Sequence, residues 1–313
     1  MSTSTSTNTG TGTGTSRPRS PSGRSGAPAF GDRLLDLAIG AAAGRAAEPG
    51  GLRFTERQLY YETCRVLSPA APLLRRVPGT PPPVLRLPSF TRALDARGRG
   101  SVPGLLPAAV PPAAPAARAD DAQDRPSEPD LYDYGLPRLL LCQDRSIAAM
   151  LLANHVHLEA ACPVLAAPDA LPLPPRLLAA LERADGATVH VLHDASPEGV
   201  TLPARVRAAL GPVPGVRVSS LGLVPRHAAA LRLPSGRGPA VAPAAGADWP
   251  AALRPREAAW LARGRFAQVA AVPPARLVRT VLRLTRGPRP PRDSMWGELS
   301  GLRTAGFMTW PAA

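Results

Sequence analysis

The pattern of apolar and polar residues changes along the chain, from a helical block near the N-terminus to a later block of short, alternating segments. In the later block, apolar runs of strand length alternate with stretches whose apolar residues recur every three or four positions. We expect strands at 138–143, 162–166, 187–193 and 216–221, and helices at 145–154, 175–183 and 197–210. Such alternation is typical of an α/β fold, a parallel sheet flanked by helices.

The clearest single helix in the pattern lies in the N-terminal block, at residues 54–67. Thr55 fits the N-cap position, and Gln58 three residues later completes a capping box. Since the cap fixes the first residue of the helix, it also fixes which side chains share a face.

The two tyrosines of this helix belong to different faces. Tyr60 shares a face with apolar residues and is expected to pack inward, whereas Tyr61 lies between Arg57 and Arg65 on an outward face. Two guanidinium groups can bind a phosphate, and their charge favours the phenolate form that nucleophilic attack requires. Tyr61 is therefore a candidate nucleophile, and Arg57 and Arg65 are candidate DNA contacts. The alternative is an exposed aromatic residue on a solvated helix face.

An acid follows the strand expected at 187–193. Asp194 comes directly after the apolar run, and Ser196, Pro197 and Glu198 form a helix start with a cap, a first-position proline and an acid in the first turn. Ligands and metals gather at the carboxyl ends of parallel strands. Asp194 is therefore the first candidate metal ligand.

These segments resemble the A subunit of topoisomerase VI and its meiotic double-strand-break relatives. The resemblance rests on Arg57-Gln58-Leu59-Tyr60-Tyr61, Asp194-Ala195-Ser196-Pro197-Glu198-Gly199 and Leu221-Gly222-Leu223-Val224-Pro225. The family joins a winged-helix domain, whose nucleophile is the second tyrosine of its motif, to a magnesium-binding TOPRIM domain. The resemblance implies a winged-helix-like domain at 30–106, a TOPRIM-like parallel sheet flanked by helices at 137–235, and Tyr61 as the nucleophile.

The magnesium site that the resemblance implies is depleted in this chain. Gln143 stands where the family has a glutamate after its first strand, and Ser196 replaces the second aspartate of the family motif. Asp144 and Glu198 are nearby acids that can supplement Asp194. Because Mg²⁺ prefers several charged oxygen ligands, we expect Asp194, Glu198 and Asp144 to hold it weakly at most.

A second cluster of possible ligands, at residues 155–162, is a poor zinc site. His155 and His157 are two positions apart and do not share a helix face, and Glu159 and Cys162 follow in the same segment. We do not expect zinc there.

The C-terminal part carries an arginine stripe on an amphipathic helix. Four arginines recur at three- and four-residue spacing, Arg276, Arg279, Arg283 and Arg286. Leu277, Val281 and Leu284 define the opposing apolar face. Such a stripe can contact several phosphates of a duplex. The alternative is an ordinary surface helix in an arginine-rich protein.

Charge and composition agree with a polyanionic partner but do not require one. The net charge is +14, and all 37 basic residues are arginine, a usage that also suggests coding bias. No apolar run approaches the roughly 20 residues of a membrane span, and the N-terminus lacks a signal-peptide pattern. We expect a soluble, cytoplasmic protein that does not bind membranes.

Three segments have the composition of tails or linkers. Residues 1–29 are of low complexity and are expected to be disordered, residues 107–136 are a Pro/Ala linker with an acidic patch, and residues 236–313 are an arginine-rich extension.

The combined interpretation is a DNA-binding protein on a topoisomerase VI A-like scaffold with weakened or lost strand cleavage. One alternative is a divergent magnesium-dependent transesterase that uses Tyr61. Another is a protein-interaction module without nucleic acid. Family members act as dimers, so the resemblance also implies a homodimer, and it is compatible with an ATPase partner subunit.

Overall fold

The computed structural model describes residues 30–68, 79–109, 135–184, 186–241 and 249–286. The low-complexity tail and most of the expected linker lie outside these residues. At the centre is a four-stranded parallel sheet in the order β2-β1-β3-β4. Its strands are β1 (Arg138–Cys142), β2 (Val164–Ala166), β3 (Thr188–Leu192) and β4 (Arg217–Ser220). The expected α/β fold with a parallel sheet is confirmed.

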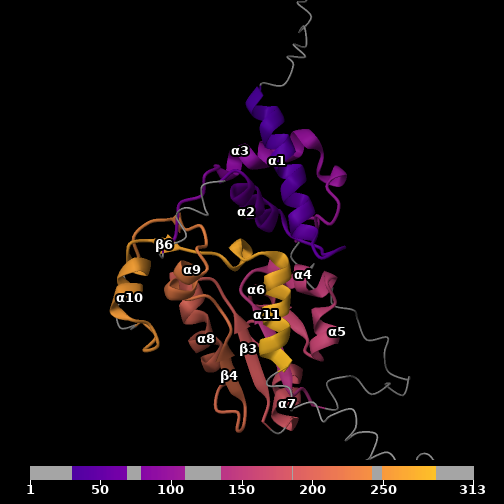
Figure 1. The fold of residues 1–313 in the computed structure, drawn as a ribbon. Helices are drawn as coiled ribbons and strands as arrows, with labels where there is room; N and C mark the ends of the chain where they lie inside the picture. The colour runs from indigo at the N-terminus through magenta and orange to yellow at the C-terminus, as the bar shows by residue number, and fades with distance from the viewer. Residues whose placement is uncertain (1–29, 69–78, 110–134, 185, 242–248, 287–313) are drawn as a thin grey trace, which may run out of the picture.

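Helices connect and cover the strands, as Figure 1 shows. They are α4 (Arg145–Ala153), α5 (Val156–Ala160), α6 (Ala167–Ala170), α7 (Pro175–Arg183), α8 (Pro197–Leu210) and α9 (Pro225–Ala230). Helices α4 and α8 each have a side-chain N-cap. The Asp144 side chain accepts a hydrogen bond from the backbone N–H of Ser146 in α4, and the Ser196 side chain accepts one from the backbone N–H of Gly199 in α8. The bounds of α7 and α8 agree with those expected from the sequence.

The two faces of the sheet have separate cores. On one face, Val189 and Val191 of β3 pack in a cluster with α7 and with Leu202 and Val206 of α8. On the other face, Leu192 belongs to a larger cluster that includes α4, α5 and the C-terminal helix α11. Helices α4 and α8, which follow the neighbouring strands β1 and β3, therefore lie on opposite faces of the sheet.

A helical region precedes the sheet. It contains α1 (Phe30–Ala47), α2 (Glu56–Val66), α3 (Leu87–Arg97) and the 3₁₀ helix η2 (Arg99–Ser101). The expected capping box at the start of α2 is confirmed, because Thr55 and Gln58 each accept a hydrogen bond from the other's backbone N–H. Residues on all sides of α2 are buried, so this helix is an interior element.

The C-terminal elements are β5 (Gly236–Arg237), α10 (Pro255–Ala262), β6 (Arg265–Phe266), the 3₁₀ helix η4 (Val269–Ala271) and α11 (Pro274–Arg286). Strands β5 and β6 form an antiparallel pair. The chain then passes between α2 and the sheet before α11 descends across the sheet (Figure 1). None of the described helices has the length and apolar character to cross a membrane.

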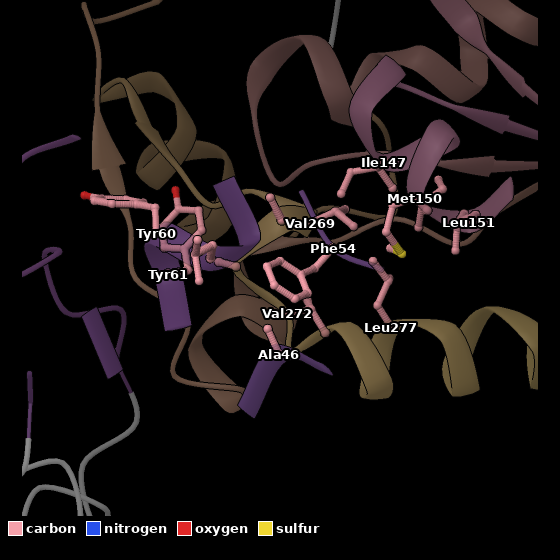
Figure 2. Packing of buried hydrophobic residues seen from close by; sticks show 14 of the residues in the cluster. Ala46, Phe54, Tyr60, Tyr61, Ile147, Met150, Leu151, Val269, Val272 and Leu277 are labelled. Carbon is pink, nitrogen blue, oxygen red and sulfur yellow. The ribbon is translucent and has the colours of Figure 1, made fainter. Parts of the chain in front are cut away.

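One hydrophobic core joins the helical region to the sheet. Figure 2 shows Phe54 between Val269 and Val272 of the C-terminal segment and Leu277 of α11, with Met150 of α4 nearby. Phe54 has no exposed surface. The helical region and the α/β region therefore share their packing through the segment around η4.

The expected apolar face of α11 needs one correction. Leu277 and Val281 are buried as expected, but Leu284 is 40% exposed and Thr285 is buried in its place. Thr285 lies four residues after Val281, so the buried stripe continues at four-residue spacing, and the Thr285 hydroxyl is satisfied by the Val281 carbonyl.

Candidate functional site

The candidate site lies at the carboxyl ends of β1 and β3. Because α4 and α8 leave these neighbouring strands toward opposite faces, a crevice opens between them, the usual ligand position in such sheets. An open pocket of about 600 Å³ lies there, lined by Arg57 of α2 and by Gln143, Asp144 and Asp194 from the strand ends. The fold thus brings Arg57 to the acids that follow the two strands.

Asp194 is held from both its backbone and its side chain. Its backbone N–H donates to Oε1 of Gln143 at 2.8 Å, and its Oδ1 accepts from the backbone N–H of Val269 at 2.7 Å. The pKa of the Asp194 carboxyl is raised to about 6, mainly by burial and also by the charge of Asp144, against the lowering effects of the Val269 N–H and of Arg57. The carboxylate therefore serves as a partly buried acceptor in the fold.

The acids expected to hold magnesium are only partly assembled. Asp144 is close enough to Asp194 to affect its pKa, but its Oδ1 caps α4 through the N–H and hydroxyl of Ser146. Glu198 is exposed in the first turn of α8. The described residues contain no group of three or more His, Cys, Asp or Glu side chains that could hold a metal. These side chains do not fit a multidentate Mg²⁺ site.

Tyr61 does not face outward, and that expectation is wrong. Its side chain is only 6% exposed, because η4 covers the face of α2 that the sequence pattern assigned to solvent. The Tyr61 hydroxyl donates to Oε1 of Gln268 at 3.0 Å, and Arg57 donates to the same oxygen at 2.9 Å. Figure 2 shows Tyr61 next to Tyr60.

Burial also reverses the expected activation of this phenol. Desolvation raises the pKa of Tyr61 to about 12, and the charge of Asp194 acts in the same direction. Arg57 and Arg65 lower the pKa as expected but do not compensate for burial. Tyr61 is therefore a protonated hydrogen-bond donor near neutral pH.

Arg65 is engaged within the fold. It forms an ion pair with Glu62 one turn earlier at 2.5 Å and donates to the backbone carbonyl of Ala271 in η4. Arg57, in contrast, is exposed at the pocket and forms no ion pair with the other described residues. Of the two arginines flanking Tyr61, only Arg57 is available to a ligand.

The segment that closes this site was not predicted from the sequence. Ala267 forms two backbone hydrogen bonds with Ala195, directly after Asp194, and Gln268 and Val269 then contact Tyr61 and Asp194. This short, mostly apolar stretch has neither a motif nor a clear periodicity. Its only signal is the glutamine, which stands alone among apolar neighbours.

Two glycines of the family-like motifs allow close approaches. A Cβ at Gly199 would lie 2.2 Å from the Asp194 carbonyl oxygen and 2.7 Å from Oε1 of Gln143. A Cβ at Gly222 would lie 2.3 Å from the ring of His193. The His193 ring is buried, with hydrogen bonds to the Asp194 carbonyl and the Ser220 hydroxyl. These contacts fix the backbone around Asp194.

The arginine stripe of α11 is largely confirmed as a surface feature. Arg276, Arg279 and Arg283 are exposed, and none forms an ion pair with another described residue. Arg286 differs, because it forms an ion pair with Glu159 of α5 at 3.1 Å. Three neighbouring cations therefore remain available on one helix.

Comparison with protein-family models, with curated proteins and with solved structures finds no match for this chain.

Proposed function

We propose that this protein binds DNA through the exposed arginines of α11 and does not cleave it. The observation that carries the proposal is that Arg276, Arg279 and Arg283 are exposed on one helix without ion-pair partners among the described residues. Three such cations can each neutralise a backbone phosphate, and the net charge of +14 adds long-range attraction. Arg57 at the pocket is a further candidate contact.

The state of the candidate catalytic groups argues against cleavage. A transesterase needs an accessible phenol that can lose its proton. Tyr61 is buried, donates to Gln268 and has a pKa raised to about 12. Asp194, the remaining family-like acid, already accepts from Val269. A DNA-binding role requires neither group to be free.

The topoisomerase VI A-like scaffold belongs to this proposal. It is supported by the adjacency of β1 and β3, which brings the two family-like acid positions, Gln143 and Asp194, together. The winged-helix-like assignment of the helical region rests on the Arg57–Tyr61 motif at the start of α2. The homodimer and the ATPase partner are proposals of the same resemblance, and a cytoplasmic location is a proposal from the composition of the chain.

The test is the DNA affinity of a triple variant, Arg276→Gln, Arg279→Gln and Arg283→Gln, measured by fluorescence anisotropy at moderate salt. The matched control is Arg176→Gln, Arg205→Gln and Arg207→Gln, which removes the same charge from exposed positions of α7 and α8 on the opposite face. We expect the first variant to bind at least tenfold more weakly than the control. Equal losses in both variants would contradict the proposed surface.

Divergent strand cleavage is a second candidate because Asp194 lies close to both Tyr61 and Asp144. The charge of Asp194 raises the pKa of Tyr61, and the charge of Asp144 raises the pKa of Asp194. Supercoiled plasmid incubated with Mg²⁺ or Mn²⁺ separates the two functions. The DNA-binding proposal expects no nicking by the wild type. Nicking that is lost in both Tyr61→Phe and Asp194→Asn would establish the second candidate instead.

A further inference from the structure

A second pocket lies between α9 and α10 and shares no lining residue with the pocket at Asp194. Its volume is about 290 Å³. Pro225 and Ala229 of α9 and Trp260 of α10 form its apolar wall, and Trp260 is only partly buried. An aromatic side chain that stays partly exposed in a pocket is available to stack on a flat ligand.

The charged residues of this pocket leave two cations unpaired. Arg226 of α9 pairs with Glu257 of α10 at 2.8 Å, so these two charges compensate each other. Arg256 of α10 and Arg265 of β6 also line the pocket and are exposed. Neither of their side chains forms an ion pair or a hydrogen bond with another residue in the described part of the chain. Both guanidinium groups can therefore bind an anion.

The volume and the side chains of the pocket fit one nucleotide. Pockets for small ligands usually have volumes of about 300–1,000 Å³, so this pocket is at the lower limit and suits a single ring system. An acidic side chain would use the two arginines but not Trp260, and an apolar side chain would use Trp260 but not the arginines. A nucleotide uses both, because its base stacks on an aromatic ring and its phosphates bind guanidinium groups.

We propose that this pocket binds one unpaired nucleotide of DNA, with its base stacked on Trp260 and the adjacent phosphates bound by Arg256 and Arg265. The nucleotide has to be unpaired, because a base inside a duplex is already stacked on both faces and cannot enter a pocket. Stacking on an aromatic ring tolerates every base, so the pocket binds single-stranded DNA with little sequence preference.

This inference rests on the proposed function and deepens it, because the pocket and the arginines of α11 lie on two sides of α9. Ala229 lines the pocket, whereas Leu231, which follows α9 with helical backbone angles, lines a small cavity with Arg276 and Arg283. Residues two positions apart on a helix point about 200° apart. Figure 1 accordingly shows α9 between α10 and α11. Since a helix is about 10 Å wide, a strand that leaves a duplex on α11 can reach the pocket within a few nucleotides.

The test compares single-stranded and duplex DNA of one sequence, with the full-length protein and fluorescence anisotropy. Trp260→Leu keeps an apolar side chain but removes the aromatic face, so it should bind the single strand about tenfold more weakly than the wild type. Trp260→Phe keeps an aromatic face and should retain most of the affinity. Trp249→Leu, outside the pocket, should bind the single strand like the wild type. Duplex affinity should be the same in all four proteins.

The arginines of the pocket are tested by the salt dependence of single-strand binding. Arg256→Gln with Arg265→Gln should reduce the slope of log affinity against log salt concentration by about 1.4, since each phosphate contact on a single strand contributes about 0.7. The control, Arg205→Gln with Arg207→Gln, should keep the wild-type slope.

Three results would overturn the proposal: an equal single-strand affinity in the wild type and Trp260→Leu, an unchanged slope in the pocket variant, or tighter binding of free deoxyadenosine monophosphate than of the strand. Failure of the proposed function has a different readout, because it appears in the duplex affinity of the α11 triple variant. Single-strand binding that depends on Trp260, without any duplex binding, would contradict the α11 surface and support this pocket.

Discussion

The Asp194 carboxylate accepts a hydrogen bond of 2.7 Å from the backbone N–H of Val269, 75 residues later in the chain. The preceding residue, Gln268, accepts from the Tyr61 hydroxyl. Two adjacent residues of one short segment thus hold the candidate metal ligand and the candidate nucleophile. This segment links the end of β3 to α2, and both Asp194 and Tyr61 are hydrogen-bonded within the fold.

The ionisation of Asp194 should make stability depend on pH. Its pKa in the folded protein is about 6, above the usual 3.8, so the stabilisation is complete below about pH 4 and is lost as the pH rises through about 6. Asp194→Asn keeps an acceptor for Val269 but cannot ionise. Between pH 4 and pH 7.5, urea unfolding should show the wild type losing about 1–3 kcal/mol relative to this variant. Parallel pH profiles for the two proteins would contradict the assignment.

Loss of the Tyr61 hydroxyl should affect stability and leave DNA binding intact. In Tyr61→Phe, Oε1 of Gln268 still accepts a hydrogen bond from Arg57, so no buried polar atom loses its last partner. The free energy of unfolding in urea should therefore fall by about 0.5–1.5 kcal/mol. Tyr60→Phe is the matched control, because the Tyr60 hydroxyl donates to the Leu85 carbonyl within the same core. A DNA affinity reduced in Tyr61→Phe but not in Tyr60→Phe would place the phenol at the nucleic acid.

The glycine after the Asp194 turn should not tolerate even a methyl group. Gly199→Ala puts its Cβ against the Asp194 carbonyl and the Gln143 side chain, so we expect a loss of about 2–4 kcal/mol. Gly44→Ala in α1 has no atom within 4 Å of the new Cβ and should stabilise the protein by about 0.5–1 kcal/mol. Thermal unfolding compares them directly, and a neutral Gly199→Ala would show that the strand-end packing is looser than described.

Local sequence signals predicted the elements whose boundaries are set by local chemistry. The Thr55–Gln58 capping box begins α2, and Ser196 with Pro197 begins α8, because each of these signals acts within a few residues. The parallel sheet followed from apolar runs separated by helical stretches. These features need no knowledge of distant residues.

The direction of Tyr61 could not be predicted in the same way. Helical periodicity separates the faces of α2, but it cannot show that η4, more than 200 residues later, covers the face assigned to solvent. The same limit applies to Asp194, whose partner Val269 contributes a backbone N–H that any residue except proline supplies. Long-range contacts of this kind leave no pattern in the sequence.

The salt dependence of DNA binding tests the central claim most directly. Each phosphate contact contributes about 0.9 to the slope of log affinity against log salt concentration. If Arg276, Arg279 and Arg283 contact phosphates, their triple glutamine variant should have a slope smaller by about 2–3 than the wild type. The control variant at Arg176, Arg205 and Arg207 should keep the wild-type slope. An unchanged slope in the α11 variant, or no measurable DNA binding by the wild type at moderate salt, would contradict the account.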